Sequence, residues 1–275
     1  MGINIQEEDR LLRATSKDEQ AKSYCLLLTA CIDPNRVNTV KNLVARIDPT
    51  IRMDDYKKAL LFWDNYHCDA IKCIVFIDNS GADLSEIRQL EKGFRLKVEI
   101  LQCHASEIPE GLHYGYSESE MIDYAVDHSE GINSCDKIIK VTGRLTFPRL
   151  AELIQWIPRG NKLLCDSRDY SFLSRAHRYI VTTLIIVDRA FYRDKLYNTR
   201  HLMPNLEFGL LEVLYFHILK PLFRKDSNEI ILRFPFNAEP EGFGATRNVN
   251  YKSYKTKATV FIRGIMRKVA PQIWI

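Results

Sequence analysis

The residues best suited to chemistry stand together at the end of an apolar run, between positions 140 and 144. Lys140 lies within the run, and Thr142, Gly143 and Arg144 close it. A guanidinium can donate two parallel hydrogen bonds to a phosphate, a hydroxyl adds a further contact, and glycine lets the backbone approach a ligand closely. The segment therefore predicts a phosphate-binding loop, with a plain strand-to-helix turn as the alternative.

A second polar loop follows another apolar run and consists of Asn79, Ser80 and Gly81. Side-chain and backbone groups of these residue types, placed at a strand end, can hold a polar ring by hydrogen bonds. The same types also dominate turns, so a turn that leads into a helix cap at Asp83 is the alternative interpretation.

The elements that must position these loops are strand-sized apolar runs alternating with amphipathic stretches. The runs are Tyr24–Ile32, Ile71–Ile77, Leu96–Leu101, Lys137–Val141 and Lys162–Cys165. Runs that are apolar on both faces are typical of parallel strands covered by helices. The sequence therefore predicts an α/β fold with a mainly parallel, Rossmann-type sheet flanked by helices.

Ligands of such sheets bind beyond the carboxyl ends of the strands. This rule makes four loops the candidate site: Thr29–Asn35, Asp78–Gly81, Thr142–Arg144 and Asp166–Asp169. Ser117, with Glu120 three residues later, predicts a helix start between two of them. The second half of the chain is less regular, and three elements are expected there: a strand at Val181–Val187, a helix at Asn205–Leu219 and a strand at Glu229–Phe234.

The composition excludes disordered and fibrous chains, since 46% of the 275 residues are hydrophobic and 27% are charged. No run of about 18 uncharged apolar residues occurs, so no transmembrane helix is expected. Residues 1–13 are partly acidic and lack the apolar core of a signal peptide, which favours a cytoplasmic location.

The motifs of several large enzyme classes are missing from the sequence. No glycine-rich phosphate or dinucleotide loop, no H-E-x-x-H and no G-x-S-x-G occurs. P-loop NTPases, dinucleotide oxidoreductases, zincins and α/β-hydrolases are therefore disfavoured. The seven cysteines form no C-x-x-C pair, so buried free thiols are expected instead of a zinc site or a disulfide framework.

The order of several segments along the chain indicates a family resemblance. These segments are Leu26–Ile32, Arg52 with Tyr56–Trp63, Ile74–Gly81, Tyr114–Glu118 and Lys140–Arg144. Together they resemble a group of bacterial GT-A-type glycosyltransferases from O-antigen and capsule gene clusters, most sharply in the Lys-Val-Thr-Gly-Arg segment. The resemblance covers roughly residues 24 to 220. It implies a nucleotide-sugar donor, expected to be UDP-linked, and a lipid-linked or polysaccharide acceptor. The implied donor-binding residues are Thr29, Cys31, Arg52, Asn79, Ser80, Gly81, Lys140, Thr142, Gly143 and Arg144.

One departure from the GT-A pattern concerns the metal. These enzymes usually carry an Asp-x-Asp motif that holds a divalent cation on the donor diphosphate, whereas the expected strand end here carries Thr142 to Arg144. Arg144 and Lys140 would then neutralise the diphosphate in place of a metal. Alternatively, Asp166 and Asp169 at a later strand end supply oxygen ligands for Mg²⁺ or Mn²⁺. Both metal-independent and metal-dependent donor binding are open.

An inverting transferase also needs a general base for the acceptor hydroxyl. Glu212 is the first candidate because Phe208, Tyr215 and Phe216 flank it at helical spacing, and burial would raise the pKa of its carboxyl group. The alternative is that Glu212 pairs with a neighbouring cation or faces solvent. Asp188, at the end of a predicted strand, is the second candidate for a catalytic or a donor-binding carboxylate.

The C-terminal end is basic. No acidic residue follows Glu241, whereas seven basic residues do: Arg247, Lys252, Lys255, Lys257, Arg263, Arg267 and Lys268. Apolar residues repeat at helical spacing between Thr256 and Val269, which predicts an amphipathic helix on the anionic cytoplasmic face of the inner membrane. A helix packed on the domain is the alternative. The slightly acidic remainder of the chain argues against a nucleic-acid partner.

The sequence thus predicts three parts: an extension over residues 1–23, one GT-A-like domain over residues 24–250 with an irregular acceptor side, and a basic tail over residues 251–275. The leading function hypothesis is sugar transfer. A non-catalytic nucleotide-binding or scaffold subunit of a polysaccharide assembly is the alternative, and turnover of the donor separates the two.

Overall fold

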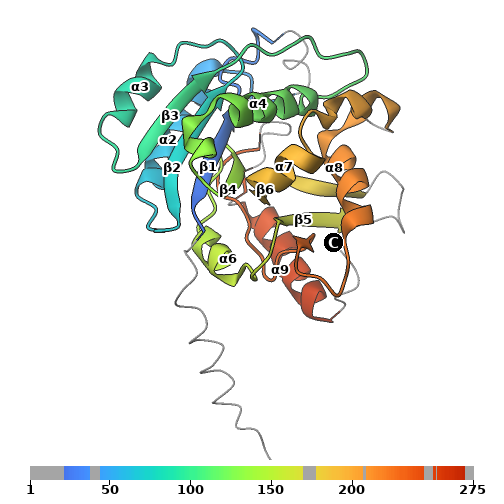
Figure 1. Cartoon of the computed structure of the whole chain (residues 1–275). Helices are drawn as coiled ribbons and strands as arrows, with labels where there is room; N and C mark the ends of the chain where they lie inside the picture. The colour runs from blue at the N-terminus through green and yellow to red at the C-terminus, as the bar shows by residue number, and fades with distance from the viewer. Residues whose placement is uncertain are drawn as a thin grey trace, which may run out of the picture.

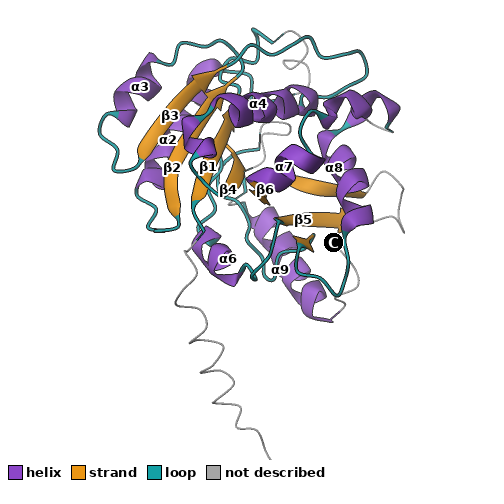
Figure 2. Cartoon of the chain, in the orientation of Figure 1, coloured by secondary structure: helices purple, strands orange, loops and turns teal. Residues whose placement is uncertain are grey.

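The computed structural model describes residues 22–37, 44–169, 178–206, 209–244, 250–251 and 253–269. Its strands form one sheet, shown in Figures 1 and 2. They are β1 (Tyr24–Ala30), β2 (Ile71–Asp78), β3 (Lys97–Gln102), β4 (Lys137–Thr142), β5 (Leu163–Asp169), β6 (Arg178–Asp188) and β7 (Ile230–Ile231). In space they follow the order β3-β2-β1-β4-β6-β5-β7.

Helices cover both faces of this sheet (Figure 1). They are α2 (Pro49–Asp64), α3 (Ser85–Glu91), α4 (Gly115–His128), α5 (Glu130–Asn133), α6 (Leu150–Trp156), α7 (Arg189–Lys195), α8 (Leu211–Leu219) and α9 (Tyr254–Val269), with 3-10 turns η2 (Thr199–Asn205) and η4 (Lys220–Leu222). Side chains alternate along β1, so Leu26 and Leu28 pack toward α2, α3 and α6, whereas Cys25 and Leu27 pack toward α4, α5 and α8. Each face therefore has its own apolar core.

The pairing of the strands confirms the predicted fold class, an α/β domain with a mainly parallel sheet flanked by helices. Strands β3, β2, β1 and β4 are parallel neighbours, whereas β6 runs antiparallel to both β4 and β5. The run at Lys162–Cys165 was expected to extend the parallel core. It forms β5, but β6 stands between β5 and β4, so the continuous parallel pairing from β3 ends at β4, and β5 pairs in parallel with β7 only.

The chain changes direction across the sheet between β1 and β4. From β1 it builds outward through β2 to β3, and it then crosses back to place β4 on the other side of β1. The two loops that leave β1 and β4 therefore depart in opposite directions, which opens a crevice at the carboxyl ends of the strands. Thr29 of β1 and Thr142 of β4 are register partners at this edge.

The helix predicted over Asn205–Leu219 differs from the observed structure. Residues up to Asn205 form the 3-10 turn η2, which contains Pro204, and the following α-helix begins only at Leu211. Gly209 between them has a φ of +52°, a left-handed conformation that no right-handed helix includes. Glu212 consequently lies in the first turn of α8. Phe208, one of the predicted flanking residues, lies outside the described residues.

Two further expectations are wrong in detail. Helix α4 begins at Gly115, so Ser117 lies inside its first turn and Glu120 accepts hydrogen bonds from Ser106 instead of closing a capping box. The strand expected over Glu229–Phe234 pairs only at Ile230–Ile231. Within the described part of the chain, no helix combines the length and the apolar character needed to cross a membrane.

Candidate active site

A cavity opens at the carboxyl ends of β1 and β4, where the sheet topology places a ligand site. Its empty volume, including the mouth open to solvent, is about 810 Å³. It is lined from both faces of the sheet, by α2 on one side and α4 and α8 on the other. The polar lining residues are Thr29, Cys31, Arg52, Tyr56, Asn79, Tyr114, Ser117, Glu118, Thr142, Arg144, Thr182, Thr183, Glu212 and Tyr251.

Arg144 reaches the cavity from the loop after β4. Its Nε donates to the carbonyl of Phe243 at 2.8 Å, and its Nη1 lies 3.5 Å from the hydroxyl of Tyr56. These contacts fix the plane of the guanidinium, and Arg144 forms no ion pair with any residue that the structure describes. A half-buried cation held in place without a carboxylate partner suits an anionic ligand such as a phosphate.

Gly143 is needed for close packing between β4 and its neighbours, whereas the sequence analysis explained this glycine by the approach of a ligand. Its backbone N–H donates to the carbonyl of Thr29 at 2.8 Å, and a Cβ built on it would stand only 2.8 Å from that same oxygen. The aromatic ring of Tyr56 lies close as well. Glycine is therefore required by the approach of β1 and α2.

Lys140 lies beneath the floor of the cavity and does not line it. Its side chain is buried, and its ammonium donates to Glu118 Oε1 at 2.6 Å and to the carbonyl of Thr182 at 2.7 Å. The hydroxyl of Thr29 donates to the same carboxylate oxygen at 3.1 Å. Lys140 is thus the counter-ion of Glu118, a carboxylate of the cavity. The sequence analysis had predicted that Lys140 contacts the phosphate directly.

Two carboxylates face the cavity, Glu118 from α4 and Glu212 from α8. Thr182 of β6 lies 3.4 Å from Glu212 through its hydroxyl. Burial raises the pKa of Glu212 above its usual value, and the nearby charge of Glu118 raises this pKa further, whereas Lys140 opposes the shift. A carboxylate with a raised pKa at the edge of a cavity has the properties of a general base.

The cavity also presents unsatisfied polar atoms. Asn79 and Ser117 are buried, and neither the Oδ1 of Asn79 nor the Oγ of Ser117 has a hydrogen-bond partner among the described residues. Buried polar atoms almost always have partners, because leaving one unpaired costs about 1–3 kcal/mol. Both side chains line the cavity, so a polar ligand there can satisfy them.

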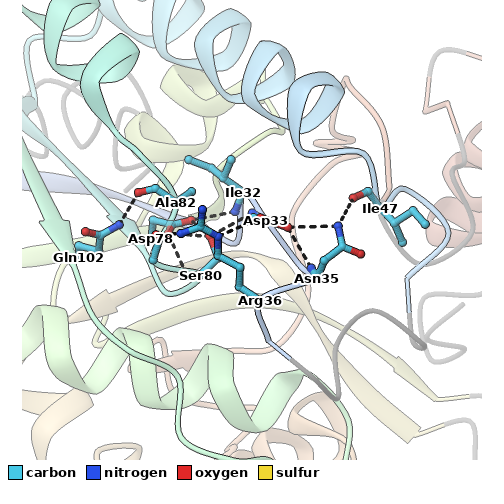
Figure 3. Close-up of polar contacts among 10 residues, drawn as sticks. Ile32, Asp33, Asn35, Arg36, Ile47, Asp78, Ser80, Ala82 and Gln102 are labelled. Atoms are coloured by element: carbon cyan, nitrogen blue, oxygen red, sulfur yellow. Dashed lines mark hydrogen bonds and ion pairs between the residues drawn. The ribbon is translucent and has the colours of Figure 1, made fainter.

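The loop that carries Asn79 is held by a buried carboxylate, Asp78 (Figure 3). Asp78 accepts hydrogen bonds from the backbone N–H of Ile32 and from the backbone and hydroxyl of Ser80, and burial raises its pKa. The hydroxyl oxygen of Ser80 in turn accepts a hydrogen bond from the backbone N–H of Asp33. Gly81 adopts a left-handed φ of +66° at the end of this loop. Ser80 and Gly81 therefore shape the loop, and Asn79 is its residue that lines the cavity.

Cys31 and Arg52 line the cavity and form part of its wall. The guanidinium of Arg52 is buried and donates to the carbonyls of Cys31 and Arg46 and to the hydroxyl of Tyr56. Burial raises the pKa of the Cys31 thiol to about 12, so this cysteine is a neutral wall residue at ordinary pH.

Asp188 does not reach the cavity. It lies opposite Lys137, the first residue of β4, whereas the cavity lies beyond Thr142 at the other end of that strand. Five residues of a strand separate the two ends by about 16 Å. Asp188 instead caps α7, where its carboxylate accepts from the backbone of Ala190 at 3.1 Å.

Asp166 and Asp169 also lie outside the cavity lining, and each already neutralises arginine. Asp166 is buried, forms ion pairs with Arg168 and Arg267, and accepts from the backbone N–H of Phe234. Asp169 pairs with Arg178 at 3.3 Å. Two carboxylates held by different arginines do not fit a shared site for Mg²⁺ or Mn²⁺, which needs uncommitted oxygen ligands. In the part of the chain that the structure describes, no cluster of three metal-binding side chains occurs.

Comparison with known proteins adds little to this geometry. No known protein family and no curated protein matches the sequence. Among solved structures, 4-diphosphocytidyl-2C-methyl-D-erythritol synthase from Anaerococcus prevotii matches 90% of this chain and 97% of its own, at 9% identity and a TM-score of 0.45. The glycosyltransferase GlyE of Streptococcus pneumoniae matches 93% of this chain but 53% of its own, at 10% identity and a TM-score of 0.46. Similarity at this level assigns no activity.

A third structure is the mannosyltransferase PcManGT from Pyrobaculum calidifontis, in complex with GDP-Man and Mn²⁺. It matches 98% of this chain and 71% of its own, at 10% identity and a TM-score of 0.42.

The sequence analysis missed several cavity residues as site candidates, Glu118, Ser117, Tyr56 and Tyr251 among them. Glu118 and Tyr56 belong to segments that carried the family resemblance, yet neither was given a role. A usable signal was the charge of Lys140: a cation inside an apolar strand needs a buried partner, and Glu118, in the first turn of α4, is that partner.

Proposed function

We propose that this protein is a glycosyltransferase that moves a sugar from a nucleotide-sugar donor, expected to be UDP-linked, to a lipid-linked or polysaccharide acceptor. The observation that carries the proposal is one cavity in which three groups face the same space: a guanidinium with no ion-pair partner and an amide oxygen with no hydrogen-bond partner among the described residues, and a carboxylate with a raised pKa. These groups match a diphosphate, a polar ring and an acceptor hydroxyl.

The reaction assigns one role to each group. Arg144 binds the donor diphosphate, and Asn79 and Ser117 hydrogen-bond the polar groups of its nucleoside or sugar. The carboxylate of Glu212 takes the proton of the acceptor hydroxyl. The freed oxygen then bonds to the anomeric carbon while the bond from that carbon to the phosphate oxygen breaks, and the nucleoside diphosphate leaves with its charge beside Arg144.

The predicted donor-binding residues divide into two groups in this proposal. Side chains that line the cavity contact the donor: Thr29, Cys31, Arg52, Asn79, Thr142 and Arg144. Ser80, Gly81, Lys140 and Gly143 act through the loops and charges that they support. No step of the proposal requires a metal ion, and the need for Mg²⁺ or Mn²⁺ is a variable of the experiment.

The biological setting is part of the same proposal. The sequence resemblance to O-antigen and capsule enzymes supports a lipid-linked or polysaccharide acceptor. Such an acceptor would place the enzyme at the cytoplasmic face of the inner membrane, with residues 24–250 as the catalytic domain.

A panel of nucleotides and nucleotide-sugars tests the proposal. A ligand that binds only the folded chain raises its melting temperature, so one donor should stabilise the protein clearly more than the others, with or without Mn²⁺. The same donor should be hydrolysed slowly to its nucleoside diphosphate in the absence of an acceptor. Binding without turnover would favour the scaffold alternative, release of pyrophosphate would indicate nucleotidyl transfer, and no stabilisation by any nucleotide would refute the proposal.

A further inference from the structure

Helix α9 packs on the domain through its charged side chains. Arg267 donates to the carbonyl of Phe234 at 2.6 Å and to Asp166 at 2.7 Å, and Arg263 lies 3.7 Å from Glu239. Arg267 is largely buried by these contacts. The carboxylate of Asp166, predicted from the sequence as a metal ligand, is therefore the anchor of this helix.

The opposite side of α9 is apolar and exposed. Phe261, Ile262, Ile265 and Val269 are exposed by 69%, 57%, 45% and 75%, and these four residues define the outer stripe of α9. Their spacing along the chain places them on one side of the helix over a length of about 12 Å. A helix that covers a core does the reverse, burying its apolar side and exposing its arginines.

The outer stripe of α9 continues into a neighbouring groove. Phe261 and Ile265 also line a depression beside Pro148 and Pro240, with an empty volume of about 1320 Å³ that includes open solvent, and Arg149, Glu239 and Glu241 line its polar part. The exposed apolar surface is therefore wider than the helix. Contiguous apolar surfaces on a folded domain usually mark a site of interaction with a protein or a membrane.

Charge distinguishes between these partners. The chain after Glu241 carries seven basic residues and no acidic one. Arg263 and Arg267 are already paired with Glu239 and Asp166 on the inner side of α9, so the cations that count toward a partner are the other five: Arg247, Lys252, Lys255, Lys257 and Lys268. A second copy docked on the same stripe would bring two such basic segments together, which is unfavourable, whereas an anionic bilayer attracts both the cations and the apolar side chains. Figure 1 shows α9 at the edge of the domain, beside α6 and away from α3.

We propose that the outer stripe of α9 is a docking surface for an anionic lipid bilayer, held in an outward orientation by the contact between Arg267 and Asp166. The inference is independent of sugar transfer, because it rests on the exposure and charge of the C-terminal segment alone. Docking would bring the chain to the surface where a lipid-linked substrate is found.

Vesicle sedimentation of the full chain tests this proposal. The vesicles contain either phosphatidylcholine alone or phosphatidylcholine with about 30% phosphatidylserine, so that charge and apolar binding are separated. We expect sedimentation with the anionic vesicles at low salt and much less with the neutral ones. The double variant Phe261→Ser/Ile262→Ser should weaken the anionic partition coefficient by about tenfold or more, since two large side chains no longer enter the bilayer.

A matched control is Leu61→Ser, which removes an apolar side chain that is 43% exposed on α2 and should leave binding unchanged. Both proteins should retain the melting temperature of the unmodified chain, because the altered side chains are exposed. A second variant, Lys252→Glu/Lys255→Glu, should abolish the preference for anionic vesicles. The proposal is wrong if the full chain ignores both vesicle types, if the double variant binds equally well, or if the chain is a dimer that Phe261→Ser/Ile262→Ser converts to monomers.

Discussion

The ammonium of Lys140 lies 2.6 Å from Glu118 Oε1, and this pair joins the central strand β4 to helix α4 directly beneath the cavity. Both groups are largely withdrawn from solvent, with side-chain exposures of 3% and 13%. The pair keeps one cavity carboxylate fixed and provides the cation that opposes the raised pKa of Glu212.

Substitution of Lys140 by methionine should destabilise the protein. The variant leaves the partly buried carboxylate of Glu118 without its counter-ion, and breaking a buried pair in this way costs about 3–5 kcal/mol. The free energy of unfolding in urea measures this loss. Lys57→Met is the control, because Lys57 pairs with Glu86 at 2.7 Å on the surface, where such a pair contributes about 1 kcal/mol or less. Equal losses in both variants would contradict the assignment.

Replacement of Glu212 by glutamine should abolish turnover and preserve donor affinity. The amide has nearly the same shape as the carboxyl group but cannot accept the proton of the acceptor hydroxyl, a contribution of about 10²–10⁴-fold to the rate. Steady-state kinetics together with a binding titration separates the two effects. Lost affinity with full turnover at saturating donor would make Glu212 a binding residue, and an unchanged rate would remove it from the mechanism.

Stability and activity should depend on pH in opposite directions through Glu212. Its pKa in the folded protein lies above the unfolded value of 4.5, so between these two values the folded state binds more protons and stability falls as pH rises. Activity should rise over the same interval because the base must be ionised. The difference between the unfolding free energies of the unmodified chain and Glu212→Gln, measured from pH 4 upward, should show this slope, and a flat difference would contradict it.

Loss of the Arg144 guanidinium should weaken donor binding without unfolding the protein. Arg144→Ala removes a charged donor that forms no ion pair within the described part of the chain, so little stability depends on its charge. Donor affinity should fall by at least about tenfold, the weight of one charge-assisted hydrogen bond. Arg193→Ala, which breaks a surface pair with Asp127, is the matched control. Affinities that agree within twofold would make the loop structural.

Gly143 should tolerate no side chain. An added Cβ would stand 2.8 Å from the carbonyl of Thr29, so Gly143→Ala must separate β4 from β1 at the cavity. We expect a loss of about 1–3 kcal/mol in unfolding free energy, together with weaker donor binding. Gly160→Ala is an informative comparison, since nothing lies near its added Cβ although its φ is +74°. A stable, fully active Gly143→Ala protein would refute the packing argument.

The parallel part of the fold could be predicted from the sequence because it depends on local patterns. Buried strands such as β1 and β2 are short continuous apolar runs, and three of the four loops selected by the carboxyl-end rule contribute residues to the cavity, whereas Asp166–Asp169 does not. The direction of β6 could not be predicted, since an apolar strand carries no mark of its orientation. The carboxyl-end rule holds for parallel strands only. Because β6 is antiparallel to β4, Asp188 lies at the edge of the sheet opposite the cavity.

Local sequence patterns could not predict the partners of individual side chains either. Lys140 pairs with a residue 22 positions earlier, and Asp166 pairs with Arg267 across 101 positions. Such contacts depend on how helices are laid against the sheet, which residue types and spacing do not specify. The sequence could therefore identify charged residues inside apolar runs as unusual, but it could not distinguish a ligand contact from an internal counter-ion.

The insertion of β6 between β4 and β5 also has a consequence for the order of assembly. Strands β1 to β4 are complete by Thr142 and can pair with one another as the chain leaves the ribosome. Strand β5, in contrast, is synthesised before either of its hydrogen-bonded neighbours, β6 and β7, and must wait for both. Until β6 pairs with it, the edge of β4 is unprotected, so we expect the growing chain to be most prone to aggregate between the emergence of β4 and that of β6 from the ribosome.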